Sequence, residues 1–109
     1  MTPNSQIIQK SFKITTERTK CIVTHIKSGT KMTGHAARIL SLMIQTEDEY
    51  IDIAEIGQML YSSTDLDWFQ KRTIDVYISK INKWLPTVQL RLLKPTRLTY
   101  AIDIASPVA

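Results

Sequence analysis

The segment RTIDVYISKINKWL, in the last third of the chain, carries the clearest pattern of apolar and polar positions. Ile74, Ile78 and Ile81 recur at spacings of four and three residues, which places their side chains on one stripe of a helix. Pro86 follows the segment, and a helix commonly ends before a proline. The pattern predicts an amphipathic helix over residues 70–85.

Two strand-like runs follow this helix, on either side of a turn at residues 94–97 (KPTR). They cover about residues 89–93 and 98–104, and together they predict a β-hairpin over residues 89–104. A helix followed by a basic hairpin is the arrangement with which winged-helix proteins hold DNA. The alternative is an ordinary surface helix with solvated lysines.

Shorter patterns predict the rest of the fold. Strands are expected at residues 11–17, 20–26 and 31–32, a short extended piece at 50–51, and helices at 34–45 and 52–61. Residues 1–9 carry no such pattern and are expected to be irregular. The fold class is therefore α+β, with an N-terminal antiparallel sheet, three helices and a C-terminal hairpin. We expect one domain over residues 1–109, with an ordered core at about 11–104.

Charged residues divide the chain into three blocks. Residues 1–46 carry seven Lys/Arg and one acid, residues 47–67 carry seven acids and no Lys/Arg, and residues 70–100 carry seven Lys/Arg and one acid. Such blocks favour separate faces with separate partners. The basic blocks suit a polyanion, and the acidic block must lie away from it. A polarised surface without a partner is the alternative.

Other classes of protein have little support in the sequence. No window approaches the roughly 18 apolar residues of a membrane helix, and the N-terminus lacks the apolar stretch of a signal peptide. The single Cys21 fits a cytoplasmic protein. His25 and His35 stand apart without other ligands at metal spacing, and no nucleophile–base set is visible. We expect no metal, no cofactor, no membrane partner and no enzymatic activity.

The segment RTIDVYISKINKWL resembles RTVDVHISRLRKKL, a typical recognition helix of the OmpR/PhoB-type winged-helix domain of bacterial response regulators. AEIGQMLY at residues 54–61 is similar to the family's REELLERVW, and TYA at residues 99–101 stands where the family often ends in GYR. The resemblance covers about residues 12–104. It implies a winged helix-turn-helix fold, here without a receiver domain. The family's wing commonly reads RGVGY, whereas residues 96–100 read TRLTY, without its glycines.

The resemblance implies a sequence-specific regulator of transcription that binds double-stranded DNA. Helix 70–85 would enter the major groove and hairpin 89–104 would be the wing. The residues expected at DNA are Arg72, Thr73, Val76, Tyr77, Lys80, Lys83, Lys94 and Arg97.

Residue chemistry gives each of these side chains a role and an alternative. Arg72 would contact a phosphate or a base edge, unless it forms a salt bridge with Asp75. Val76 would touch a thymine methyl group, or be buried against the wing. Thr73 would bond a phosphate or cap the helix, and Tyr77 would contact the groove or pack at the core edge.

Lys80 would contact a base or a phosphate, and Lys94 and Arg97 would reach the minor groove or its phosphates. Trp68 and Trp84 are expected in the core or at its edge.

Two further partners are expected from the resemblance. In the family, the loop that corresponds to residues 62–68 can contact RNA polymerase, and relatives place two domains on tandem half-sites. The alternative for this loop is a solvated segment in which Asp65 or Asp67 caps the next helix. A different function stays open: a winged-helix protein-interaction module, an anti-regulator or adaptor, with little or no DNA binding.

Overall fold

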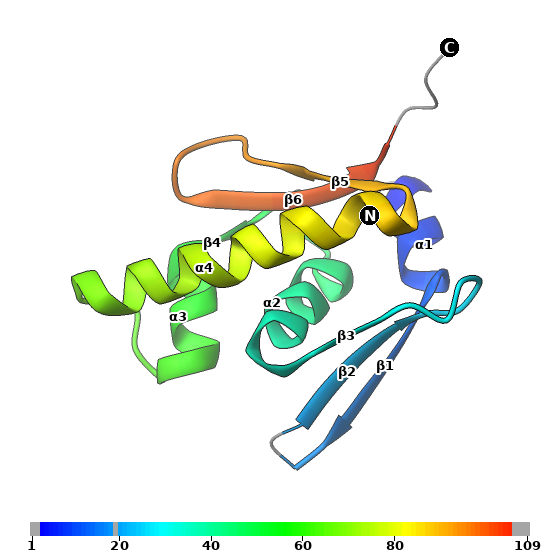
Figure 1. Ribbon diagram of the computed structural model, residues 1–109. Helices are drawn as coiled ribbons and strands as arrows, with labels where there is room; N and C mark the ends of the chain where they lie inside the picture. The colour runs from blue at the N-terminus through cyan, green and yellow to red at the C-terminus, as the bar shows by residue number, and fades with distance from the viewer. Residues whose placement is uncertain (1–2, 19, 106–109) are drawn as a thin grey trace.

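Helix α2 (Gly34–Gln45) lies at the centre of the molecule and packs against two small antiparallel sheets (Figure 1). The computed structural model describes residues 3–18 and 20–105, and in the first helix the side chains from Gln6 onward. Ile39 and Leu40 of α2 have no exposed surface, so the core forms around this helix. The predicted α+β class is confirmed.

The first sheet is formed by the N-terminal part of the chain. Its strands are β1 (Phe12–Glu17), β2 (Lys20–His25) and β3 (Lys31–Thr33), in that order across the sheet. Phe12 is paired with His25, and the Cys21 and Val23 side chains of β2 turn into the core. The three predicted strands are confirmed to within one or two residues at their ends.

The second sheet joins the hairpin to a distant short strand. Its strands are β4 (Ile51–Asp52), β6 (Thr99–Ile104) and β5 (Leu90–Leu93), in the order β4-β6-β5. Leu93 pairs with Ala101, which confirms the predicted hairpin, and Ile51 pairs with Tyr100 on the other side of β6. Ile51 and Tyr100 are both buried. The hairpin is therefore anchored to the core through its second strand.

Two threonines close the tip of the hairpin. The Thr96 main-chain N–H donates a hydrogen bond to the Thr99 hydroxyl oxygen at 2.9 Å, and the hydroxyl oxygens of both residues lie 2.9 Å apart. The Leu98 N–H donates to the Thr96 hydroxyl oxygen at 3.3 Å. Side-chain bonds to nearby backbone stabilise such turns. They hold this tip where the resembling family has glycines.

Aspartates cap both helices that precede the hairpin, α3 (Ile53–Tyr61) and α4 (Trp68–Trp84). Asp52 accepts a bond from the Glu55 main-chain N–H at 2.9 Å. Asp67 accepts one from the Gln70 N–H at 2.8 Å, and Gln70 accepts one from the Asp67 N–H at 3.0 Å. This reciprocal capping box starts α4 two residues before the predicted position. At its other end, α4 passes into a 3-10 turn, Leu85–Val88, that contains Pro86.

The N-terminal residues were expected to be irregular, but Pro3–Lys10 form helix α1. Ile8 is 4% exposed and joins the core, whereas Ile7 is 53% exposed. A helix with one strongly buried side chain gives no periodicity to detect, and its stability comes from packing against α2 and β6. The described residues thus form four α-helices rather than three, and the ordered core begins before residue 11. Residues 1–2 and 106–109 lie outside the described residues.

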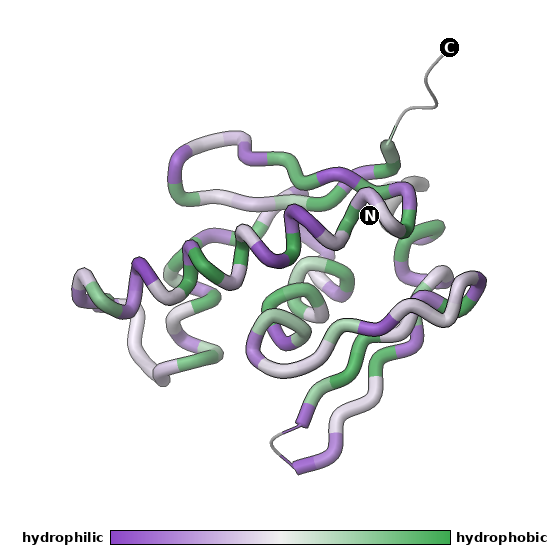
Figure 2. The backbone as a smooth tube through the Cα atoms, viewed as in Figure 1, coloured by the Kyte–Doolittle hydropathy of each residue, from purple (hydrophilic) through white to green (hydrophobic). Residues whose placement is uncertain are grey.

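Figure 2 shows that helices α2 and α4 differ in hydropathy. Helix α2 is mainly apolar along its length, whereas α4 alternates between polar and apolar residues. Within the described ranges, no helix combines the length and the apolar character needed to cross a membrane.

Candidate nucleic-acid interface

Helix α4 has one buried stripe and one open face. Ile74, Ile78 and Ile81 are buried, as the periodicity predicted. On a helix with about 100° per residue, Arg72, Val76 and Lys83 point away from this stripe. All three are exposed, as are Ser79 and Lys80 near them.

Arg72, Val76, Lys80 and Lys83 therefore share one exposed face of α4, as the sequence predicts. The exposed fraction of Val76 is 49%, so burial against the hairpin does not explain this apolar residue. In the described part of the chain, Arg91–Asp103 is the one ion pair, so the alternative salt bridge between Arg72 and Asp75 is not formed. The Arg72 guanidinium carbon instead lies 5.9 Å from the centroid of the Trp68 ring.

Thr73 and Tyr77 lie on the flank of α4 and are half-buried. The Thr73 hydroxyl donates a hydrogen bond to the Phe69 carbonyl oxygen at 2.9 Å, so Thr73 is not the cap of the helix. The Tyr77 ring packs against His35, with 5.7 Å between the ring centroids. The Lys80 ammonium lies 5.9 Å from the Tyr77 ring. Tyr77 thus belongs to the core edge and also borders the open face.

The hairpin lies alongside α4 (Figure 1). Burial raises the pKa of the Tyr100 hydroxyl in β6, and the Asp75 carboxylate of α4 raises it further. Asp75, the one acid of α4, is therefore near enough to the hairpin to act on the Tyr100 hydroxyl. Lys94 and Arg97 are exposed at the hairpin turn, where Lys94 lies 5.6 Å from the Tyr100 ring.

Two aromatic residues on α4 change the predicted interface. Trp68 is 65% exposed and Phe69 is 74% exposed, with their rings edge to face at 5.0 Å. The prediction that Trp68 lies in the core or at its edge is wrong, because α4 begins at this residue rather than after it. Phe69 was missed, although it lies seven residues before Val76 and so projects from nearly the same side.

The other tryptophan lies where the sequence predicts. Trp84 is half-buried, and its ring lies 6.1 Å from that of Phe12. Its indole N–H is buried and has no hydrogen-bond partner among the described residues.

The loop before α4, predicted as 62–68, covers residues 62–67 and folds back onto α3. Leu66 is buried, and its side chain occupies the space that a side chain on Gly57 would need. The Asp65 main-chain N–H donates to the Ser63 hydroxyl oxygen at 3.1 Å. Asp65 and Asp67 stay exposed, so this loop presents acids beside the aromatic pair.

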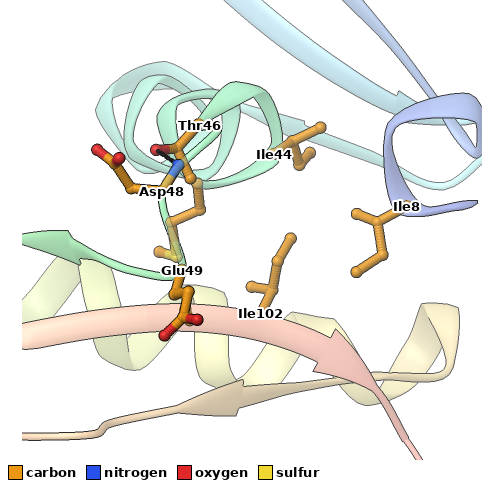
Figure 3. A pocket seen from close by; sticks show the side chains of 8 residues that line it. Ile8, Ile44, Thr46, Asp48, Glu49 and Ile102 are labelled. Atoms are coloured by element: carbon orange, nitrogen blue, oxygen red, sulfur yellow. Dashed lines mark hydrogen bonds between the residues drawn. The ribbon is translucent and has the colours of Figure 1, made fainter. Parts of the chain in front are cut away.

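The acidic segment after α2 borders a small apolar pocket (Figure 3). Ile8, Ile44 and Ile102 line it, with Asp48 and Glu49 at its rim, and its volume is about 30 Å³. This volume is about that of one water molecule. The pocket therefore offers no room for a small-molecule ligand.

No group of three or more potential metal ligands occurs among the described residues. His25 lies on β2 and its Nδ1 is 2.8 Å from the Ser28 hydroxyl oxygen, and His35 is exposed in the first turn of α2. Cys21 is buried, and burial raises the pKa of its thiol, which lowers its reactivity.

No family model, curated protein or solved structure matches the chain.

Proposed function

We propose that this chain is a sequence-specific, double-stranded DNA-binding regulator of transcription with a winged helix-turn-helix fold. Helices α3 and α4 form the helix-turn-helix, α4 is the recognition helix, and the β5–β6 hairpin is the wing. The OmpR/PhoB-type resemblance of residues 72–85 supports this proposal, as does the order of elements from α2 to β6. We further propose that the protein acts in the bacterial cytoplasm.

One observation carries the proposal: the outward face of α4 presents three cations. Arg72, Lys80 and Lys83 are exposed there, and Asp75 is the one acid of α4. A helix in the major groove needs such a face, because phosphates flank the base edges on both sides. Val76 between these cations would contact the methyl group of a thymine.

The hairpin cations have a different role in this proposal. Lys94 and Arg97 lie at the tip, beyond the strand pairing, where they would contact phosphates or the adjacent minor groove. Phosphate contacts position a protein on DNA without reading its sequence. We therefore expect α4 to provide most of the specificity and the hairpin to provide mainly affinity.

Selection of bound fragments from random duplexes, followed by titration, tests the proposal. Arg72→Ala and Lys80→Ala should each weaken binding to the selected site by about 1–3 kcal/mol if the side chain contacts a base. Lys10→Ala, a lysine on α1, is the matched control and should leave binding unchanged. Unchanged binding in both α4 variants would exclude this helix from the interface.

The salt dependence of DNA binding distinguishes the contribution of the wing from that of the recognition helix. Exchanging Lys94 and Arg97 together for glutamine should lower the slope of log affinity against log salt by about one to two units. The preference among DNA sequences should stay the same. An unaltered slope would mean that the wing does not contact the phosphates.

A second function, a winged-helix protein-interaction module, is favoured by the apolar part of the same face. Trp68, Phe69 and Val76 are all about half exposed or more, and Trp is enriched where proteins bind each other. An anti-regulator of this kind would bind DNA weakly or not at all. Binding of the selected duplex with a steep salt dependence would argue against it.

A further inference from the structure

The exposed aromatic pair, Trp68 and Phe69, is the most unusual surface feature of the chain. A protein loses stabilising burial when it leaves two large aromatic rings in water, so such a pair indicates a contact surface. Figure 1 shows the first turns of α4, where the pair lies, extending beyond α3 and the hairpin. A partner can thus reach both rings without moving the rest of the protein.

Four interactions hold the first turn of α4 in place. The reciprocal capping bonds between Asp67 and Gln70 fix its start, at 2.8 and 3.0 Å. The Thr73 hydroxyl bonds the carbonyl oxygen of Phe69. Arg72 lies over the Trp68 ring, at cation–π distance. A partner therefore meets a helix start whose main chain is already fixed, with the Trp68 ring in contact with both Phe69 and Arg72.

Cations lie on the helical side of the pair, and acids lie on its loop side. Lys71 and Arg72 follow Gln70 on α4, and Lys80 and Lys83 continue the exposed face toward its C-terminal end. Asp65 and Asp67 are exposed in the loop before the pair. Aromatic rings interleaved with cations are typical of surfaces that stack nucleic-acid bases while the cations hold the backbone. Asp67 faces the same end, but its carboxylate is engaged as the helix cap.

We propose that one ring of the Trp68–Phe69 pair stacks on a base that has left the double helix, while the other ring packs edge to face against it, so that the protein prefers DNA with an unpaired base beside its duplex site. The proposal rests on the proposed function, because α4 must lie against the duplex. An intact duplex offers no base face to the rings, since every face is covered by its neighbours. A bulged or frayed base does offer one.

Three DNA molecules test this inference: the selected duplex, the same duplex with a one-base bulge at either flank, and its single strand. The protein should bind one bulged duplex about tenfold more tightly than the intact one, as expected for stacking of one base. A 2-aminopurine placed at the bulge should lose fluorescence on binding. The double variant Trp68→Ala/Phe69→Ala should bind both duplexes with the affinity that the native protein has for the intact one.

Two control variants separate stacking from other effects. Ile26→Ala removes an equally exposed apolar side chain that lies just after β2, so the preference for the bulge should survive. Phe69→Tyr keeps an aromatic ring and should also keep the preference. Because Trp68 and Phe69 are mostly exposed, the double variant should unfold at the same temperature as the native protein.

Each result has a distinct meaning. Equal affinity of the native protein for intact and bulged duplexes overturns the stacking proposal and leaves the DNA-binding function standing. A double variant that weakens both duplexes equally also overturns it, because the rings then act in the groove. Failure of the native protein to bind any of the three molecules overturns the proposed function itself, and favours a protein as the partner of the aromatic pair.

Discussion

Helices α2 and α4 both carry regular apolar patterns, but they use them differently. Seven of the twelve residues of α2 are buried, against three of the seventeen residues of α4. Packing therefore dictates most of the sequence of α2. The outer residues of α4 are free of that constraint, so packing in the core does not dictate Arg72, Val76 and Lys80.

The largest effect on stability is expected from a substitution in the core of α2. Leu40 has no exposed surface, and Leu40→Ala should lower the free energy of unfolding by about 2–5 kcal/mol. Lys80→Ala on the open face of α4 is the matched comparison and should change stability by less than about 0.5 kcal/mol. Urea denaturation followed by circular dichroism measures both. Similar losses in the two variants would show that the outer face of α4 supports the fold.

A smaller effect is expected where the loop 62–67 meets α3. A Cβ atom on Gly57 would lie 2.6 Å from the Leu66 Cδ2 atom and 2.8 Å from the Ser63 carbonyl oxygen. Gly57→Ala should thus destabilise the protein by about 1–3 kcal/mol, despite the better helix propensity of alanine.

The double variant Gly57→Ala/Leu66→Ala separates this clash from other causes. Leu66→Ala alone measures the loss of the leucine. Adding Gly57→Ala to it should cost less than in the native protein, because the two clashing Leu66 methyl groups are gone and only the Ser63 carbonyl oxygen remains close. Equal costs of Gly57→Ala in both backgrounds would argue against this packing.

The stability of the protein should also fall at alkaline pH because of Tyr100, which lies in strand β6 of the hairpin. Its pKa is raised in the folded state by burial and by Asp75, so folding favours the neutral hydroxyl. The contribution is complete below the ordinary tyrosine pKa of about 10 and is lost as the pH rises through the folded-state pKa. Denaturation at pH 8 and at about pH 11 should show a smaller loss for Tyr100→Phe than for the native protein. An equal loss would place the alkaline sensitivity elsewhere.

The sequence predicts those helices and strands whose apolar residues repeat at a regular spacing. It does not predict an element whose position depends on a single contact. The stripe of Ile74, Ile78 and Ile81 correctly predicted a helix at α4, and the Asp52–Glu55 spacing correctly predicted where α3 begins. Helix α1 could not be foreseen, because among its described side chains, from Gln6 onward, Ile8 is the one buried in the core. Trp68 was misplaced because the Asp67–Gln70 capping box, and not the apolar stripe, sets where α4 begins.

Part of the candidate site follows from the sequence in the same way. The helical spacing predicts which cations share the open face of α4. It cannot predict how far the helix projects beyond its neighbours, which is what exposes Trp68 and Phe69. Nor does it give the hydroxyl bonds between Thr96 and Thr99 that close the hairpin without glycine.

The smallest effect is expected on the binding of two copies side by side on DNA. In that arrangement a basic region of one copy would contact an acidic region of the other. Lys13, Lys20 and Lys31 are exposed on the N-terminal sheet, and Glu47, Asp48 and Glu49 are exposed after α2. We propose that these surfaces meet when two copies bind tandem half-sites, in a heterologous contact. Exposed ion pairs are weak, so cooperativity should be only about fivefold, at half-sites spaced roughly 10–11 base pairs centre to centre.

Charge reversal gives this contact a sharp test. Changing Glu47, Asp48 and Glu49 together to lysine should remove the cooperativity and leave affinity for a single half-site nearly intact. Changing Lys13, Lys20 and Lys31 to glutamate should do the same. A mixture of the two variants should regain cooperativity, because each then offers the charge that the other lacks. Independent filling of the half-sites by the native protein at every spacing would exclude the contact, since an electrostatic pairing between neighbours must depend on the distance that the DNA sets between them.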